Sequence, residues 1–238
     1  MMKNIGLLIA GGSGKRMGQD IPKQFLTVNE KPVIIYTLEA FQAHPMIDAI
    51  GVVCLEGWEN VLQAYANQFN ITKLKHIIPG GKNGQDSIRN GVYELEKHYD
   101  PQDIVLIHDA IRPMVSEEII TSNIVTTQKY GCSITIIPCV EAMLTTDDGV
   151  ESTGIYPREG LKRTQTPHGF RLGEICDLHR RALERGITNS VASCTLKIEM
   201  GEKVYFSAGS EKNIKLTTVD DIDIFKALLL AKRSNWLK

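Results

Sequence analysis

The sequence predicts an α/β protein built on a mostly parallel β-sheet with helices on its faces. Short apolar runs alternate along the chain with stretches that have helical spacing, and the segments after three of the runs are rich in polar residues and glycine. Strand–helix alternation of this kind is typical of βαβ units, whose strands run parallel. Ligands of such sheets bind beyond the carboxyl ends of the strands. We therefore expect function in those polar segments.

The elements follow in order along the chain. Apolar runs predict strands at residues 5–10, 49–55, 75–78, 104–108 and 133–138. Helical spacing predicts helices between them at 34–42, 58–69, 85–96 and 117–130. Farther on, the pattern predicts a helix at 172–185, a strand around 203–206 and a closing helix at 221–232. We expect one domain over residues 1–238, since no repeat, low-complexity tract or linker divides the chain.

Residues 139–163 break the alternation. Strand candidates at 141–145 and 150–155 flank Asp147-Asp148-Gly149, and Asp-Gly is a hairpin signal. An inserted hairpin is either a decoration or an arm that reaches a partner subunit, and the spacing favours neither.

Composition excludes several classes of protein. The net charge is −1, so we expect neither nucleic acid nor a membrane as a partner. No apolar run reaches membrane-spanning length, and the chain becomes polar from Gly11 onward, unlike a signal peptide. Five scattered cysteines without a Cys-x-x-Cys pair predict reduced, mostly buried thiols rather than a zinc site or a disulfide frame. A soluble cytoplasmic protein is expected.

The first apolar run leads into a glycine-rich turn with cations. Residues 11–14 contain three glycines, and Lys15, Arg16 and Lys23 follow. Glycines let backbone N–H groups approach a ligand closely, so the turn suits a phosphate chain. It is neither a P-loop nor a dinucleotide fingerprint, because Arg16 replaces the P-loop Ser/Thr and Met17 replaces the last fingerprint glycine. The alternative is a tight turn with surface charges.

Two further strand ends carry polar groups. Residues 79–87 are flexible and polar, and His108-Asp109 follows the fourth strand. Asp109 has the carboxylate that Mg²⁺ prefers, although it could instead cap a helix or pair with Arg112. His108 is expected to be packed. Lys215 lies in a turn that leads into a helix, where it is either a surface lysine or a phosphate contact.

These residues suit nucleotidyl transfer, in which an acceptor oxygen attacks the α-phosphorus of a nucleoside triphosphate and pyrophosphate leaves. Such enzymes act mainly by positioning and charge stabilisation, with a metal ion neutralising the phosphates. A phosphate monoester acceptor has a second pKa of about 6 and is already largely dianionic near neutral pH. It requires no general base, and no Ser/His/Asp or Cys/His arrangement stands out in the sequence.

The motifs, in their order, resemble one family. They are the glycine loop with Arg16, Pro-Lys-Gln-Phe at 22–25, Gly-Gly…Asp-Ser at 80–87, His-Asp-Ala-x-Arg-Pro at 108–113, Gln-Thr-Pro at 165–167 and Asn-Ile-Lys-x-Thr-Thr at 213–218. This pattern, which spans nearly the whole chain, is similar to the 2-C-methyl-D-erythritol 4-phosphate cytidylyltransferases of isoprenoid synthesis and to their close relatives, the ribitol-5-phosphate cytidylyltransferases. The resemblance implies a Rossmann-like fold of the nucleotide-diphospho-sugar transferase type, and synthesis of a CDP-alcohol from CTP with Mg²⁺.

The resemblance also implies roles for individual residues. The implied CTP contacts are Ala10, Gly11, Gly12, Ser13, Gly14, Gly81 and Ser87. The implied catalytic residues are Arg16, Lys23 and Lys215. The implied acceptor contacts are Asp109, Arg112, Arg158 and Thr166, with Asp109 also supporting the metal. The family dimerises through a curved β-arm, which makes residues 139–163 such an arm and assigns Arg158 to the partner's site.

The chain departs from the family pattern on the acceptor side. Ala142 follows Glu141 where the family has Asp-Thr, and His168 replaces a glutamine. Asn189-Ser190-Val191-Ala192-Ser193 stands where the family usually has Thr-Asp-Glu-Ala-Ser. A site that hydrogen-bonds a hydroxyl discriminates strongly by that contact, so these changes bear on the identity of the acceptor.

Three functional hypotheses result. Methylerythritol phosphate is the first acceptor expected, because residues 85–91 are more similar to that branch. The alternative is ribitol 5-phosphate or another alditol phosphate used for a surface glycan. A CTP-binding paralogue without turnover is a third hypothesis, which the intact Arg16, Lys23, Asp109 and Lys215 disfavour.

Overall fold

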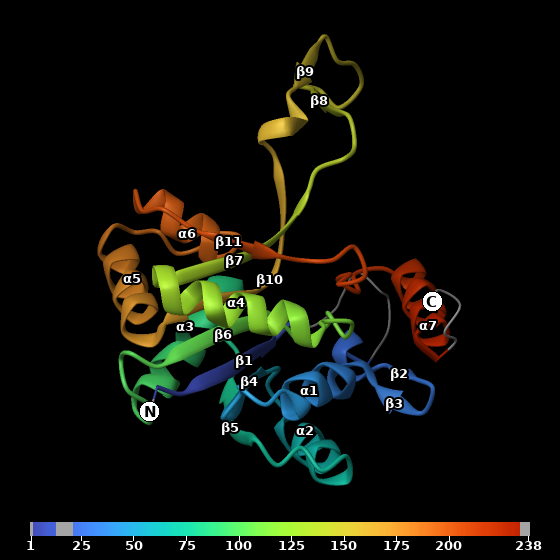
Figure 1. The fold of residues 1–238 in the computed structure, drawn as a ribbon, viewed down its shortest axis with the longest axis vertical. Coiled ribbons are helices and arrows are strands. Elements are labelled where there is room, and N and C mark those ends of the chain that lie inside the picture. Colours follow the sequence, from blue (N-terminus) through green and yellow to red (C-terminus); the bar gives the residue numbers. More distant parts are fainter. Residues whose placement is uncertain (1, 13–20, 234–238) are drawn as a thin grey trace.

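A seven-stranded sheet in the order β11-β7-β10-β6-β1-β4-β5 forms the centre of the molecule (Figure 1). The computed structural model describes residues 2–12 and 21–233. The strands of this sheet are β1 (Asn4–Ala10), β4 (Ala49–Cys54), β5 (Leu74–Pro79), β6 (Ile104–Asp109), β7 (Cys132–Pro138), β10 (Lys162–Arg171) and β11 (Phe206–Ala208). Only β10 runs antiparallel to its neighbours in this sheet. The predicted α/β class with a mostly parallel sheet is confirmed.

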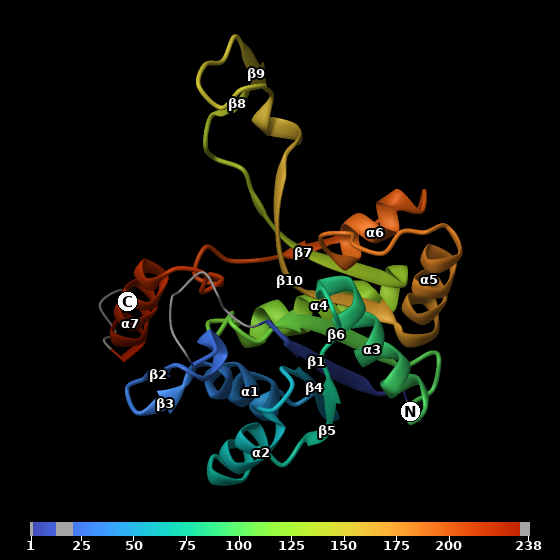
Figure 2. The same ribbon diagram turned by 180° about the vertical axis from the view of Figure 1, so that it is seen from behind.

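Helices cover both faces of the sheet. One face carries α1 (Val33–Ala43), α2 (Glu59–Gln68) and α4 (Glu117–Tyr130). The other carries α3 (Gly84–Glu96), α5 (Leu172–Glu184) and α6 (Ser193–Glu199), which Figure 2 shows from behind. The last helix, α7 (Val219–Arg233), lies to one side and packs Phe225 into a smaller apolar cluster.

The alternation of side chains along β1 explains the two-sided core. Ile5 and Leu7 belong to the cluster under α3 and α5, whereas Leu8 and Ala10 belong to the cluster under α1 and α4. Successive side chains of a strand point to opposite faces, so a strand covered on both sides is apolar throughout. The run at residues 5–10 is continuously apolar because β1 is covered by helices on both faces.

Capping residues fix where the helices next to the polar segments begin. Asn83 precedes α3 and accepts a hydrogen bond from the Asp86 amide at 2.9 Å. Ser116 does the same for the Ile119 amide at the start of α4, which ends at Gly131 with φ of 84°. Side-chain acceptors at the first position and left-handed glycine at the last are favoured helix boundaries.

The strands predicted at 5–10, 49–55, 75–78, 104–108 and 133–138 are confirmed, as are the predicted helices. The strand predicted around residues 203–206 is wrong in position, because pairing with β7 begins only at Phe206. The prediction omitted several elements: β10, α6, the short 3₁₀ helix η2 (Lys23–Phe25) and the small hairpin of β2 (Thr27–Val28) and β3 (Lys31–Pro32).

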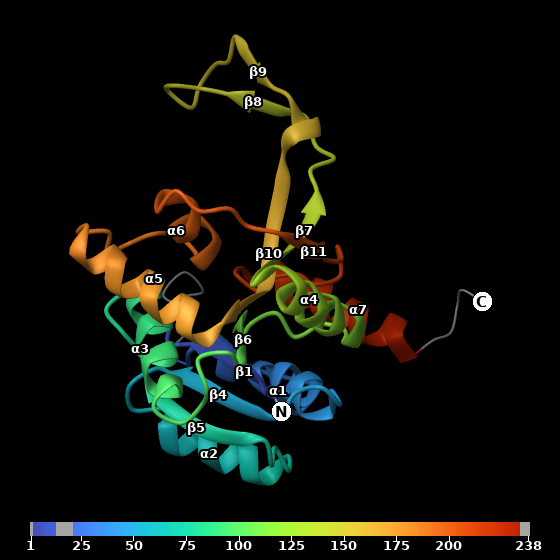
Figure 3. The same ribbon diagram turned by 60° about the vertical axis from the view of Figure 1, so that its left-hand side comes forward.

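Residues between β7 and β10 form an arm that projects from the body (Figure 3). It carries β8 (Met143–Thr145), β9 (Gly154–Tyr156) and the 3₁₀ helix η3 (Arg158–Gly160). The Asp-Gly signal lies in a longer loop than a two-residue turn, since Thr145 pairs with Gly154, and the two strands are shorter than predicted. No helix in the described part of the chain has the length and apolarity needed to cross a membrane.

Candidate active site

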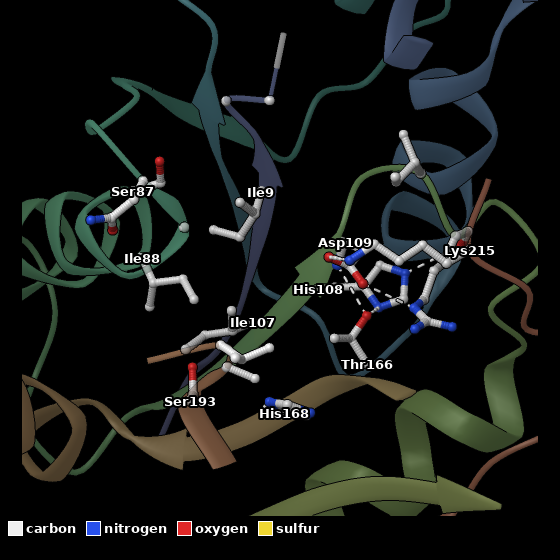
Figure 4. A pocket seen from close by; sticks show the side chains of 18 of the residues that line it. Ile9, Ser87, Ile88, Ile107, His108, Asp109, Thr166, His168, Ser193 and Lys215 are labelled. Atoms are coloured by element: carbon white, nitrogen blue, oxygen red, sulfur yellow. Dashed lines mark hydrogen bonds and ion pairs between the residues drawn. The ribbon is translucent and has the colours of Figure 1, made fainter. Parts of the chain in front are cut away.

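A cavity of about 690 Å³ opens at the carboxyl ends of β1 and β6. Several segments that are distant in sequence line it, and Figure 4 shows part of this lining. They include Gly11 and Gly12 after β1, Gly81–Ser87 after β5, Asp109–Arg112 after β6, Thr164–His168 on β10, and Lys215. The polar strand ends singled out by the sequence therefore do meet at one place.

Gln24 ties the start of the glycine turn to η2. Its buried Nε2 donates to the carbonyl of Ala10 at 2.7 Å and to that of Gly12 at 3.0 Å. Ala10 itself is buried, so its side chain belongs to the core rather than to the cavity wall. Lys23, next to Gln24, lines the cavity. Ser13, Gly14 and Arg16 lie outside the described residues.

Gly81 and Ser87 form the opposite wall. The Gly81 amide donates to Ser87 Oγ at 3.0 Å, which folds the segment back onto the start of α3. A Cβ added to Gly81 would lie 2.4 Å from Cβ of Asp86, so this position requires glycine. At Gly11, a Cβ would approach Ser87 Oγ to 3.3 Å. The two glycine-rich segments thus adjoin each other.

Asp109 is held between two cations. Its Oδ2 accepts from Arg112 Nε at 3.0 Å, and its Oδ1 lies 3.1 Å from Lys215 Nζ. Its amide donates to Thr166 Oγ1 at 3.0 Å, which joins β6 to β10. The interpretation of Asp109 as the partner of Arg112 is confirmed, and Lys215 and Thr166 join the same cluster (Figure 4).

The charge of Asp109 is secured by its neighbours. Burial alone would raise the pKa of this carboxyl, but Lys215 and Arg112 outweigh burial and lower the pKa to about 2. The carboxylate is therefore ionised throughout the neutral range. Among the described residues, no group of three or more His, Cys, Asp or Glu side chains is placed to hold a metal.

His108 is packed beneath this cluster, as predicted. Its ring is fully buried, and burial lowers its pKa to about 4. Thr166 Oγ1 accepts from the Asp109 amide, so its proton is available for His108 Nδ1 at 3.0 Å. His108 Nε2 then carries the proton and donates to the Arg112 carbonyl at 3.2 Å. The neutral ring fixes Thr166 and the Arg112 backbone and has no free nitrogen for acid–base chemistry.

Asn213 is a residue that sequence reasoning included in a motif but gave no role. It is fully buried, its carbonyl accepts from Arg112 Nη1 at 2.8 Å, and its Nδ2 donates to the Thr166 carbonyl at 2.9 Å. It therefore positions both residues at once. Gln24 was likewise given no role of its own. Both residues are polar and lie inside the recognised motifs, and the structure shows that both side chains are buried.

Comparison with known proteins agrees with this geometry. A sequence model of the 2-C-methyl-D-erythritol 4-phosphate cytidylyltransferase family matches residues 5–231. The chain belongs to this family. It is a CTP-dependent nucleotidyltransferase that transfers a cytidylyl group to a polyol phosphate.

Relatives of this cytidylyltransferase fall into two groups. A ribitol-5-phosphate cytidylyltransferase of Lacticaseibacillus paracasei is 42% identical, over 95% of this chain and 97% of the relative. A second, from Vibrio parahaemolyticus, is 41% identical over 95% of each. A 2-C-methyl-D-erythritol 4-phosphate cytidylyltransferase of Clostridium botulinum is 36% identical over 96% of this chain and 98% of the relative.

Solved structures share the fold. The 4-diphosphocytidyl-2C-methyl-D-erythritol synthase of Anaerococcus prevotii superposes with a TM-score of 0.82 at 23% identity, covering 96% of both chains. The 2-C-methyl-D-erythritol 4-phosphate cytidylyltransferase of Francisella tularensis gives 0.80 at 24% identity, covering 94% of this chain and 99% of the other. At these identities, the two comparisons show a shared arrangement of helices and strands.

Arg158 lies apart from the other predicted site residues of the cytidylyltransferase. It stands on the exposed arm, where its Nη1 donates to the Val140 carbonyl at 2.6 Å. The described residues that line the cavity do not include it.

The departures from the family pattern are divided between the cavity and other places. Val191 and His168 line the cavity. Ser190 is held instead by the buried Gln85, whose Oε1 accepts from its amide at 2.6 Å. Ala142 lies on the arm, and Asn189 is exposed outside the described cavity lining.

Proposed function

We propose that this cytidylyltransferase uses ribitol 5-phosphate as its acceptor and forms CDP-ribitol and pyrophosphate from CTP. The observation that supports this acceptor is the pair of relatives at 42% and 41% identity that carry that name, against 36% for a methylerythritol phosphate enzyme. Methylerythritol phosphate, and with it a role in isoprenoid synthesis, was the first expectation from the sequence. It becomes the second candidate.

The nucleotide would lie across the two glycine-rich segments. Gly11 and Gly12, continued by Ser13 and Gly14, would present backbone N–H groups to the triphosphate, as glycine-rich turns do. Gly81 and Ser87 would hold the cytidine on the opposite wall.

Cations would act on the transferred phosphorus. Lys23 lines the cavity, and together with Arg16 it would stabilise negative charge on the triphosphate in the transition state. Lys215 would contact the α-phosphate, and its partial exposure beside Asp109 leaves its ammonium group within reach of the cavity. Charge stabilisation of this kind is the main catalytic device in phosphoryl and nucleotidyl transfer.

The acceptor phosphate would lie at Arg112 and Thr166, with Arg158 contributed by a partner subunit. One of its oxygens forms the new bond to the α-phosphorus while the bond to the bridging oxygen breaks and pyrophosphate leaves. The acceptor phosphate is already ionised, so no residue must remove a proton. The neutral, fully engaged ring of His108 agrees with that requirement.

The residues present fit a Mg²⁺ ion that is held mainly by the nucleotide. Mg²⁺ commonly binds one or two carboxylates and completes its shell with substrate phosphates and water. Asp109 supplies one ionised carboxylate at the cavity, and each of its oxygens keeps a lone pair beyond those facing Arg112 and Lys215. When bound, the ion would neutralise charge on the phosphates.

We also propose that the enzyme is a cytoplasmic homodimer assembled through residues 139–163. The arm exposes the apolar side chains of Leu144, Val150 and Ile155, which are 65%, 88% and 82% exposed. Apolar side chains gathered on a projecting hairpin are typical of an interaction surface.

The deciding experiment measures pyrophosphate release from CTP and Mg²⁺ with ribitol 5-phosphate, methylerythritol phosphate and glycerol 3-phosphate separately. We expect the highest kcat/KM with ribitol 5-phosphate. A preference for methylerythritol phosphate would overturn the acceptor assignment and leave the reaction type intact. CTP binding without release from any acceptor would instead support an inactive paralogue.

A further inference from the structure

Two buried polar side chains in the cavity wall each present an atom without a hydrogen-bond partner, although the other side of the His168 ring is bonded to the Gln165 backbone. His168 on β10 is 4% exposed and Ser193 at the start of α6 is 2% exposed, and both line the cavity. Within the described part of the chain, neither His168 Nε2 nor Ser193 Oγ makes a hydrogen bond. A buried polar atom without a hydrogen bond destabilises the fold. Two such atoms beside a substrate cavity therefore call for a functional explanation.

The chemistry of the pair suits hydroxyl groups. Burial lowers the pKa of His168 to about 4, which outweighs the opposing effect of Asp109, so the ring is neutral in the working range. The other ring nitrogen of His168 already donates to the Gln165 backbone, so the free Nε2 of the neutral ring is an acceptor, and the Ser193 hydroxyl can both donate and accept. Ile9, Ile88 and Ile107 supply apolar side chains to the same cavity. Two uncharged polar groups in an apolar wall do not suit a phosphate. The two cations beside Asp109, which are Arg112 and Lys215, suit a phosphate better.

The position of His168 points to the acceptor. His168 and Thr166 are two residues apart on β10, and both line the cavity. Thr166 bonds the Asp109 amide in the cluster assigned to the acceptor phosphate. A five-carbon chain that starts from a phosphate at Thr166 is long enough to bring its hydroxyls to His168.

We propose that His168 and Ser193 hydrogen-bond hydroxyl groups of the acceptor's polyol chain and thereby determine which alcohol phosphate the enzyme uses. This inference rests on the proposed function. Sites that hydrogen-bond a substrate hydroxyl reject analogues that lack it far more strongly than apolar pockets reject a change in size. His168 and Ser193 are therefore specificity-determining residues.

The ribose of CTP carries hydroxyls of the same chemistry, so the test must separate the two substrates. The variants are His168→Leu, which removes the hydrogen-bonding groups, His168→Gln, which keeps a donor and an acceptor, and Ser193→Ala. His179→Leu is the matched control. His179 is also buried with no partner for its ring nitrogens in the described chain, but it lines a small adjoining cavity with Gln85 and Leu196, which Ser193 also borders, and it does not line the substrate cavity.

Steady-state kinetics are measured with ribitol 5-phosphate and with an analogue that lacks one chain hydroxyl, and with CTP and 2′-deoxy-CTP. For His168→Leu and Ser193→Ala we expect KM for ribitol 5-phosphate to rise roughly tenfold, the effect of one neutral hydrogen bond, and KM for CTP to stay within about twofold. Discrimination against the deoxy acceptor should fall by the same factor. His168→Gln should recover part of it, and His179→Leu should keep the wild-type values.

Three results would overturn the inference. The first is an unchanged acceptor KM in His168→Leu and Ser193→Ala. The second is lost discrimination against 2′-deoxy-CTP, which would assign the pair to the ribose. The third is an equal loss in His179→Leu, which would indicate packing alone. Wild-type enzyme that is inactive with ribitol 5-phosphate but active with another polyol phosphate would refute the proposed acceptor, and the same variants would then be tested on that acceptor.

Discussion

Arg112 donates from Nε to Oδ2 of Asp109 across 3.0 Å, from a position three residues farther along the chain. The side chains of both are largely buried, with 12% of Arg112 and 21% of Asp109 exposed. The Asn213 carbonyl accepts a hydrogen bond from another nitrogen of the Arg112 guanidinium. The pair is thus fixed from two sides before any substrate arrives, and its charges can act on phosphates with little reorganisation.

Asp109→Asn should reveal the low pKa of this carboxyl in the pH dependence of stability. The pKa is lowered from 3.8 to about 2, so the stabilisation is complete above pH 4 and is lost as the pH falls toward 2. The difference in unfolding free energy between wild type and variant should therefore shrink by about 1.5 kcal/mol from pH 5 to pH 2.5. Urea unfolding at the two pH values measures it.

The same variant should lower kcat by roughly 100-fold or more at pH 7, since it removes a preorganised charge from the site. Asp177→Asn is the control, because it removes an exposed ion pair with Arg181, and its effect on stability should stay below about 1 kcal/mol. A pH-independent difference for Asp109→Asn would contradict the low pKa.

Gln24→Glu should disturb the CTP side of the cavity. In the wild type, Gln24 Nε2 donates to the carbonyls of Ala10 and Gly12. At pH 7 the glutamate carboxylate has no proton to donate, so its oxygen would lie against two carbonyl oxygens without a hydrogen bond. We expect a loss of about 2 kcal/mol in unfolding free energy and a fall of roughly 100-fold in kcat/KM for CTP. Gln63→Glu, at an exposed position on α2, should change neither quantity. Unaltered kinetics in Gln24→Glu would show that Gln24 does not position the turn.

His179→Leu should make the protein less sensitive to acid. Burial lowers the pKa of His179 from 6.5 to about 4, so the unfolded chain takes up a proton first as the pH falls. The folded state is thereby disfavoured below pH 6.5, by about 2 kcal/mol at pH 5 for this one group. Between pH 7.5 and pH 5, the unfolding free energy of the variant should therefore fall by about 2 kcal/mol less than that of the wild type. An identical loss in both proteins would mean that His179 titrates normally.

Much of the cavity could be predicted because its edges are local. The segments containing Gly11, Gly81 and Asp109 each follow an apolar run, and the carboxyl ends of parallel strands necessarily meet at one edge of a sheet. What the sequence could not show depends on tertiary contacts. The bond between Asp109 and Thr166 joins positions 57 residues apart, and it exists only because β10 inserts beside β6.

The missed strand has a physical explanation. β10 reads Lys-Arg-Thr-Gln-Thr-Pro-His-Gly-Phe-Arg, with a single large apolar residue, Phe170. Strand signals rely on β-branched, aromatic or alternating apolar residues, and buried polar residues give none. Gln165 and His168 are buried because the neighbouring strands and the 210–213 segment surround them. The placement of Thr166 and His168 beside β6 could not be predicted from strand signals for the same reason.

Mixed dimers test whether Arg158 acts in the partner's cavity. Its position on the arm, away from the described lining of its own cavity, predicts that one chain supplies Arg158 and the other supplies Lys215 to each site. Arg158→Ala and Lys215→Ala should each be nearly inactive alone. When they are unfolded and refolded together, half of the dimers should be mixed, and each mixed dimer should hold one complete site, giving about a quarter of wild-type activity.

The control for that experiment is a chain with both substitutions, refolded with an equal amount of wild type. If the arm acts across the dimer, every mixed dimer in this control contains two damaged sites, and activity should fall to about a quarter of that of an all-wild-type sample. If Arg158 served its own chain's site, the wild-type chain would stay active in every dimer, and about half of the activity would remain. Half activity in the control, with none in the first mixture, would therefore refute a shared site.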